Sequence, residues 1–254
     1  EHDVDLIHEC IVKMAKEISE FMSITSDKQR MDSLMVAANI RNLSLLELFY
    51  TCVANLCKIM DKRGTKIPDE QHHYVEKDDY NKCIYHKRGM DATERTIVVM
   101  KDADVLIKIC DLTGDFDDTS EYQLLIRLLK ERTIIDGDGS RRLRKKEEVE
   151  NSSEVLLNPS DPEATFRYKA GSKHLGYVGN IVESVGENSS LIIDYAYQQN
   201  TYTDNQFMKD YLDGKKDFPD GAFIVADGAY SGEENSRLAS EHKLKLVTTN
   251  FTGR

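Results

Sequence analysis

"AFIVADGAYSGEEN", residues 222–235, is the stretch that best indicates the fold. It begins with a continuous apolar run, which is typical of a strand buried on both faces. Asp227 and Gly228 end that run, and a polar helix start follows. In an open α/β sheet, ligands and catalytic groups gather at the carboxyl ends of parallel strands. We therefore expect Asp227 to lie at such an end, with a plain turn or cap as the alternative role for its carboxylate.

The segments around this stretch predict a mixed sheet. Strand patterns rich in Ile, Val and Tyr occur in "LGYVGNIVESV" and "SLIIDYAYQQN", which the turn "GENS" joins into a hairpin. A capped helix, "TDNQFMKDYLDG", leads to the apolar strand, and a second helix with Ser231 as its expected N-cap leads to "LKLVTTN". The order strand, strand, helix, strand, helix, strand predicts an α/β fold whose sheet mixes parallel and antiparallel strands.

The first 150 residues follow a mostly helical pattern. An amphipathic helix comes first, and then "RMDSLMVAANI" at 30–40 is a short apolar segment typical of a buried strand. Ser44 and Glu47 have the spacing of a capping box, which starts a strongly apolar helix. Charged helical segments follow, and we interpret them as a helical insertion after the first strand. The expected organisation is an N-terminal helix over 1–29, the first strand and helix of the sheet domain over 30–60, the insertion over 61–150, and the rest of the sheet domain over 151–254.

Composition indicates an ordinary globular protein. The 254 residues are 40% hydrophobic, and we find no apolar run of the about 18 to 20 residues that a membrane helix needs. The start of the chain lacks the features of a signal peptide, so we expect a cytoplasmic protein with no membrane partner. The formal charge of −11 is unusual for a nucleic-acid-binding protein. The five cysteines are odd in number and widely spaced, which argues against disulfides and zinc and favours reduced core residues: Cys10, Cys52, Cys57, Cys83 and Cys110.

A second carboxylate occurs in an apolar setting. Asp32 lies within the segment 30–40, where an unpaired buried charge is costly unless a metal or cation compensates it. Asp32 and Asp227 together therefore suggest a shared divalent ion. Mg²⁺ is normally held by one or two carboxylates with water and substrate phosphate, which is the arrangement that phosphoryl-transfer sites use.

Four sequence blocks occur in an order that is known from one family. The blocks are "MDSLMVAANIRNLSLLELFYTCVANL", "NPSDPEATFRYKAGSKHLGYVGNIVES", "QQNTYTDNQF" and "IVADGAYSGEENSRLASEHKLKLVTTNFTGR". They cover most of residues 30–60 and 155–254. Together they resemble the DDE-type transposases of bacterial insertion sequences, whose catalytic domain is ribonuclease H-like. The resemblance implies a ribonuclease H-like fold with a helical insertion after the first strand.

The resemblance also implies a chemistry. Asp32 is similar to the family's first metal-binding catalytic aspartate, and Asp227 to the second. Two Mg²⁺ ions, with Mn²⁺ as a substitute, would then serve cleavage and strand transfer on DNA by a homodimer in the bacterial cytoplasm, associated with the nucleoid. The third acidic residue, a glutamate on a later helix, has no counterpart, because Glu233 and Glu234 fit solvated charges at a helix start. We therefore expect a chain truncated before that glutamate and inactive alone.

Two basic segments are candidates for contact with DNA phosphates. The first, at 160–177, contributes Arg167, Lys169, Lys173 and His174. A lysine-rich edge strand is the plainer explanation of that segment. Arg141 and Arg142 begin "RRLRKK", the sole dense basic run, for which a solvated loop is the alternative. Asp161 either assists the site or caps the turn before Pro162.

The segment "IIDGDGS" at 134–140 supports other hypotheses. Asp136 and Asp138 resemble the nucleophile and the acid of haloacid dehalogenase-type phosphatases, although only two apolar residues precede Asp136. A calcium loop fits less well, because Arg141 occupies the position that needs glycine. Clusters of Gly and Asp between helices are usually turns, and a polar turn is our interpretation. A further hypothesis is a non-catalytic, transposase-derived interaction module that binds no metal.

Overall fold

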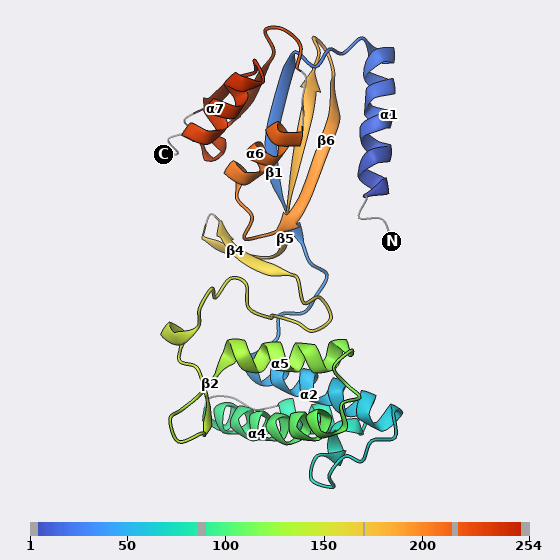
Figure 1. Ribbon diagram of the computed structural model, residues 1–254, viewed down its shortest axis with the longest axis vertical. Helices are drawn as coiled ribbons and strands as arrows, with labels where there is room; N and C mark the ends of the chain where they lie inside the picture. Colours follow the sequence, from blue (N-terminus) through green and yellow to red (C-terminus); the bar gives the residue numbers. More distant parts are fainter. Residues whose placement is uncertain (1–4, 86–89, 170, 215–217, 250–254) are drawn as a thin grey trace. The chain divides into compact units, whose positions relative to one another are not determined.

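Two compact units make up the chain (Figure 1). We call residues 1–37 with 166–254 the sheet unit, and residues 38–165 the helical unit. The computed structural model describes residues 5–85, 90–169, 171–214 and 218–249.

The sheet unit is built on one mixed sheet. Its strands are β1 (Lys28–Ala37), β4 (Thr165–Lys169), β5 (Ser172–Val185), β6 (Ser190–Gln199), β7 (Phe223–Asp227) and β8 (Lys245–Thr249). The strand order is β4-β5-β1-β7-β8, and β6 also pairs with β5. β5 runs antiparallel to β1 and β6, whereas β1, β7 and β8 are parallel to one another. The predicted α/β fold with a mixed sheet is therefore confirmed.

Helices follow the strands of this unit in the predicted order. They are α1 (Leu6–Met22), α6 (Asp204–Gly214), the short 3₁₀ helix η3 (Gly228–Tyr230) and α7 (Glu233–Glu241). α1 packs along β6, α7 packs against β8, and α6 contacts both α7 and η3. The apolar residues of α6 and α7 enclose one core with alternate residues of the strands, whereas among the described residues α1 contributes only Ala15 to it. Fully buried members include Val178, Met208, Leu212, Ile224 and Tyr230.

The helical unit forms a core of its own. Its elements are α2 (Leu45–Lys62), η1 (His72–Val75), α3 (Asp79–Ile84), α4 (Met90–Thr113), α5 (Ser120–Arg132), the hairpin of β2 (Thr133–Ile135) and β3 (Arg141–Leu143), and η2 (Lys146–Glu148). α2 is the central helix, because it contacts both α4 and α5. Its fully buried side chains include Phe49, Leu56 and Met60. The burial of so much apolar surface on one helix stabilises this unit independently of the sheet.

The boundary between the units differs from the predicted division. We expected residues 30–60 to belong with the sheet and the insertion to begin at 61. In the structure, β1 ends at Ala37, and α2 lies within the helical unit because its apolar residues pack against α4 and α5. The insertion therefore extends over residues 38–165.

Of the two predicted helix caps, the one at Ser44 is present and the one at Ser231 is not. The capping box is present, since the Glu47 N–H donates to the Ser44 hydroxyl at 3.3 Å and the Ser44 N–H donates to the Glu47 carboxylate at 2.7 Å. Ser231 does not cap α7, and that prediction is wrong. The N-cap is Gly232, while the Ser231 hydroxyl turns back and donates to the Gly228 carbonyl at 2.6 Å.

None of the described helices has the length and apolar character that crossing a bilayer requires. The cysteines are free thiols. Three of them are buried as predicted, whereas Cys83 is half-buried and Cys10 is exposed on α1.

Candidate functional site

The parallel pairing of β1 with β7 relates the two predicted aspartates. The last pair of this ladder is Arg30 with Val225. Asp32 and Asp227, the last residue of β7, each lie two residues beyond this pair, so the same register would bring them opposite each other where the ladder itself has ended. Neighbouring strands of a sheet lie about 4.8 Å apart. Two carboxylates that are 195 positions apart in the chain thus come to adjacent strands.

Strand alternation puts both aspartates on the same face of the sheet. Met31 and Ile224 point into the core with α6, so Asp32 and Asp227 point to the opposite face. Both aspartates are exposed. We had expected Asp32 to be buried in an apolar strand, and that premise is wrong because β1 buries only one of its faces at this point. The cost of burying a charge therefore does not explain Asp32.

Each carboxylate is oriented by a backbone amide. Asp32 Oδ1 accepts the N–H of Ser33 at 2.8 Å, and Asp227 Oδ1 accepts the N–H of Ala229 at 2.8 Å. The latter bond caps η3, so the expected capping role of Asp227 is also real. Among the described residues, no Lys, Arg or His forms an ion pair with either aspartate. Two neighbouring carboxylates without a cationic partner attract a cation from solution.

Tyr230 is a core residue whose hydroxyl feels the charge of both aspartates. It is fully buried, and its hydroxyl accepts a hydrogen bond from Asn180 Nδ2 at 2.7 Å. Burial raises the pKa of the Tyr230 phenol far above its usual value, and the charges of Asp204, Asp32 and Asp227 raise it further. The three carboxylates therefore lie within electrostatic reach of one hydroxyl, which stays protonated.

Asp204 is a residue that the sequence did not single out. It starts α6 and is only 8% exposed, and its Oδ1 has no hydrogen-bond partner among the described residues. A carboxylate in the first turn of a helix is stabilised by the helix dipole, which accounts for part of its placement. The sequence "TDNQF" shows only a helix start, so a third negative charge near Tyr230 was not foreseeable from it.

The donor set of this site suits hard cations. Asp32 and Asp227 offer only carboxylate oxygens, which Mg²⁺ and Mn²⁺ prefer and which softer metals do not select. Their exposure leaves room for water and for substrate oxygens around an ion. The residues therefore fit a divalent ion of the kind that the resemblance implies. Glu233 and Glu234 are exposed in the first turn of α7, as predicted, and Glu234 pairs with Arg237 at 3.0 Å.

The first basic segment forms the β4–β5 hairpin. Lys169 and Lys173 are exposed, while Arg167 and His174 are half-buried. Lys173 lies over the ring of Phe166, with its ammonium 4.2 Å from the ring centre. β4 is the edge strand of the sheet, and its exposed Lys169 with the neighbouring Lys173 has the character of the lysine-rich edge that we gave as the alternative.

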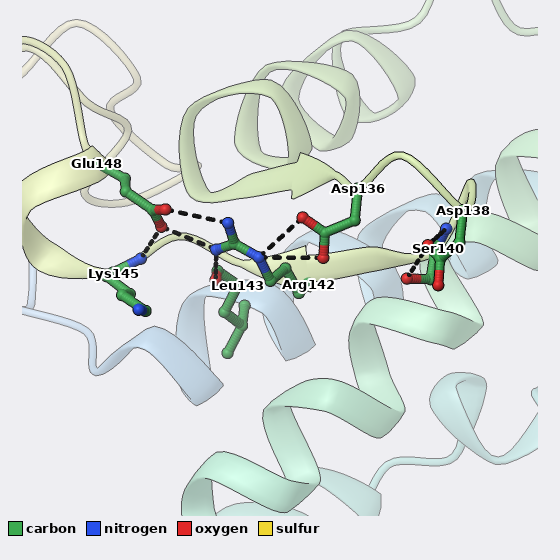
Figure 2. Close-up of polar contacts among 7 residues, drawn as sticks. All are labelled: Asp136, Asp138, Ser140, Arg142, Leu143, Lys145 and Glu148. Carbon is green, nitrogen blue, oxygen red and sulfur yellow. Dashed lines mark hydrogen bonds and ion pairs between the residues drawn. The ribbon is translucent and has the colours of Figure 1, made fainter.

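The first two arginines of the second basic segment are paired with carboxylates of the helical unit. Arg141 Nε donates to Asp104 at 2.8 Å, and its Nη1 donates to the hydroxyl of Thr133. Arg142 bridges Asp136 and Glu148 (Figure 2). A DNA phosphate would have to displace these carboxylates before it could bind either arginine.

The "IIDGDGS" segment is a turn between β2 and β3, as we interpreted it. Figure 2 shows Asp136 held by Arg142, whose Nε donates to both carboxylate oxygens at 3.1 Å. Asp138 accepts from the N–H and the hydroxyl of Ser140, which lower the pKa of its carboxyl. Arg142 and the Lys145 N–H likewise lower the pKa of Glu148 to about 2. These carboxylates close a turn, and an aspartate held by arginine is a poor nucleophile.

Asp161 belongs to a neighbouring turn of the helical unit. Its N–H donates to the Asn158 carbonyl at 3.2 Å, and its carbonyl accepts from Ala164. The side chain of Asn158 accepts from Ser160 and donates to the Arg41 carbonyl. The turn before Pro162 is therefore supported by an asparagine that we had not considered.

Searches of protein-family models, of curated proteins and of solved structures found no match to the chain. The candidate site is therefore defined by its own geometry. That geometry consists of two exposed carboxylates on the adjacent strands β1 and β7, two residues beyond the last pair of their ladder, and a buried tyrosine whose hydroxyl feels the charge of both.

Proposed function

We propose that this chain is the catalytic region of a DDE-type transposase, with a ribonuclease H-like sheet unit. One observation carries the proposal. Asp32 in the middle of β1 and Asp227 at the carboxyl end of β7 each lie two residues beyond the last pair of the parallel β1–β7 ladder, and neither has a cationic partner among the described residues. The carboxyl end of β7, where Asp227 lies, is the part of an α/β sheet where catalytic groups are usually found.

The order of elements supports the proposed fold. An antiparallel hairpin, β5 and β6, precedes two helix and strand pairs, and β1 lies at the centre of the sheet. The helical unit enters the chain directly after β1, which agrees with an insertion after the first strand. Mixed sheets occur in enzymes of many functions, so the two aspartates carry the functional assignment and the sheet alone does not.

The residues have distinct roles in the proposed reaction. Asp32 and Asp227 would hold the divalent ions, and the amides of Ser33 and Ala229 fix the orientation of their carboxylates. Bound Mg²⁺ supplies a Lewis acid that favours attack by water, and later by a DNA 3′-hydroxyl, on a phosphodiester. Tyr230 stays neutral and adds no further negative charge beside the two carboxylates. The reaction is an in-line displacement at phosphorus without a covalent protein intermediate.

DNA is the proposed partner, and the β4–β5 hairpin is the proposed contact. Lys169 and Lys173 are exposed there and would bind phosphates without reading sequence. Arg141 and Arg142 are weaker candidates because carboxylates hold them. Self-association into a homodimer in the bacterial cytoplasm, close to the nucleoid, is part of the same proposal.

Titration with Mn²⁺ tests the site. We expect Asp32→Asn and Asp227→Asn each to weaken Mn²⁺ binding about tenfold or more, which corresponds to about 1.4 kcal/mol. Asp220→Asn is a matched control, because Asp220 is an exposed carboxylate in the turn before β7. Asp136→Asn tests the phosphatase alternative and should leave Mn²⁺ binding unchanged.

Two results would contradict the proposal. If Asp32→Asn and Asp227→Asn bind Mn²⁺ as the parent does, the two aspartates do not form the site. If the parent binds no Mn²⁺ at all, the chain is better described as a non-catalytic interaction module. Isothermal titration calorimetry on the folded variants distinguishes these outcomes.

A further inference from the structure

Three metal-binding side chains of different chemistry meet in the helical unit. They are His73 on η1 and Asp79 and Cys83 on α3, and their ligand atoms all lie within 4.8 Å of one another. His73 Nδ1 is 2.8 Å from Asp79 Oδ2, and Cys83 Sγ donates to the same oxygen at 3.5 Å. This cluster belongs to a different unit from Asp32 and Asp227.

The local sequence explains why these residues converge. Asp79 and Cys83 are four positions apart on α3, so they lie on the same face of the helix one turn apart. His73 comes from the turn of 3₁₀ helix just before α3, and its ring packs in a tilted arrangement against Tyr74, with ring centres 4.1 Å apart. This spacing therefore brings an imidazole nitrogen, a carboxylate oxygen and a thiol sulfur close enough together to bind one ion.

Aromatic residues hold the carboxylate in place from behind. The Tyr50 hydroxyl donates to Asp79 Oδ2 at 2.6 Å, and the Tyr50 ring packs against both Tyr74 and Tyr80. Burial raises the pKa of Tyr50 far above its usual value, so Tyr50 remains a donor. The Asp79 side chain is 8% exposed. A buried carboxylate that is fixed by an outer hydrogen bond is the usual support of a metal-ligating group.

A cavity of about 390 Å³ adjoins the cluster. His73 and Cys83 line it, and so do three carboxylates and one guanidinium: Asp91, Glu94, Asp102 and Arg95. The excess of carboxylates favours a cation, although Arg95 opposes it. The His73 side chain is 37% exposed, which gives an ion a path from solvent.

We infer that His73, Asp79 and Cys83 bind a transition-metal ion of the zinc type, with water from the cavity as the fourth ligand. Zn²⁺ accepts thiolate, imidazole and carboxylate in a tetrahedral arrangement, and three protein ligands leave one position open. Mg²⁺ and Ca²⁺ select oxygen donors and would not use the thiol. The bound ion would tie η1 to α3.

Binding requires a defined change of protons. Cys83 must lose its thiol proton to solvent, because the thiolate is the ligand. His73 must carry its proton on Nε2 so that Nδ1 is free. Burial and the charge of Asp79 raise the pKa of the free Cys83 thiol, so an ion has to displace this proton. About one proton should therefore be released for each ion bound.

Cobalt is a direct probe of the sulfur ligand. We expect Co²⁺ added to the full chain to give a thiolate-to-metal charge-transfer absorption, and Zn²⁺ to abolish it by displacement. Cys83→Ser should remove the absorption, and His73→Ala should weaken binding about tenfold or more. Cys10→Ser is the matched control, because Cys10 is an exposed cysteine in the sheet unit, and it should leave the absorption unchanged.

Several outcomes would overturn the inference. It fails if the folded parent shows no charge-transfer absorption with Co²⁺, or if Cys83→Ser keeps it. It also fails if Zn²⁺ raises the melting temperature of Cys83→Ser as much as that of the parent. Circular dichroism verifies that each variant is folded. Asp32→Asn and Asp227→Asn should not affect Co²⁺ absorption, so this inference and the proposed transposase site can fail separately.

Discussion

Replacing Tyr230 with phenylalanine removes a single oxygen beside the candidate site. The Tyr230 hydroxyl accepts from Asn180 Nδ2 at 2.7 Å, and the two residues are 0% and 3% exposed. The variant keeps the ring but leaves a buried amide without this acceptor, which costs about 1–3 kcal/mol. For a chain of this size each kcal/mol corresponds to about 2–4 °C in melting temperature. Urea denaturation followed by circular dichroism measures the change.

Tyr168→Phe is the control for Tyr230→Phe, because Tyr168 is 69% exposed. Its hydroxyl is solvated in both states, so we expect a change below about 0.5 kcal/mol. Equal effects of the two substitutions would refute the buried hydrogen bond at Tyr230.

The pH dependence gives the same substitution a second readout. The phenol of a tyrosine in the unfolded chain has a pKa of about 10. Burial raises the pKa of the Tyr230 phenol in the folded chain above that value. Above about pH 10 the folded chain therefore binds more protons than the unfolded chain, and stability falls by up to about 1.4 kcal/mol per pH unit for this group. Phenylalanine lacks the effect, so the difference in stability between parent and variant should shrink as the pH rises above about 10. A difference that stays constant into this range would show that Tyr230 ionises normally.

Two further predictions concern the helix cap and the basic hairpin. Ser44→Ala removes the side-chain acceptor of the α2 capping box and should lower the unfolding free energy by about 1 kcal/mol, whereas Ser44→Gly should lower it by only a few tenths. Urea denaturation checks both, and an unchanged midpoint for Ser44→Ala would contradict the cap. Lys169→Gln should weaken binding to duplex DNA and reduce the salt dependence of log K by about one unit in slope, whereas Lys245→Gln on β8 should not. Fluorescence anisotropy at several salt concentrations measures this, and equal slopes for the two variants would exclude the hairpin as the contact.

The regular elements could be predicted because their patterns are local. The apolar run before Asp227 indicates a strand, and Ser44 with Glu47 indicates a helix start, since each pattern depends on a few neighbouring residues. The alternation of strands and helices then gave the mixed sheet. Local patterns do not show which elements α2 packs against. We therefore assigned α2 to the sheet, whereas it packs against α4 and α5. Its apolar surface fits a sheet or a helix bundle equally well, and only packing decides between them.

The environments of the charged residues were not accessible from the sequence. Arg142 is part of a basic run in the sequence, but it is neutralised by Asp136 and Glu148, one of which is six positions before it and the other six after it. Asp32 follows a buried methionine and was expected to be buried, although a strand that packs on one side exposes every second residue. Tertiary contacts decide which charged residues pair and which side of a strand faces the core. Local sequence patterns do not specify these contacts.

The two candidate metal sites make different demands on an ion. Asp32 and Asp227 are exposed and offer oxygens alone, which suits an ion that keeps its water and takes substrate oxygens as ligands. His73, Asp79 and Cys83 offer three kinds of donor, which suits an ion that binds thiolate and imidazole. A chain with a formal charge of −11 attracts cations in general, so affinity for one metal is weak support for either site. The test lies in selectivity: Mn²⁺ should respond to the aspartates and Co²⁺ to the cysteine. If each variant changed the binding of both metals alike, the cations would be following net charge and neither site would stand.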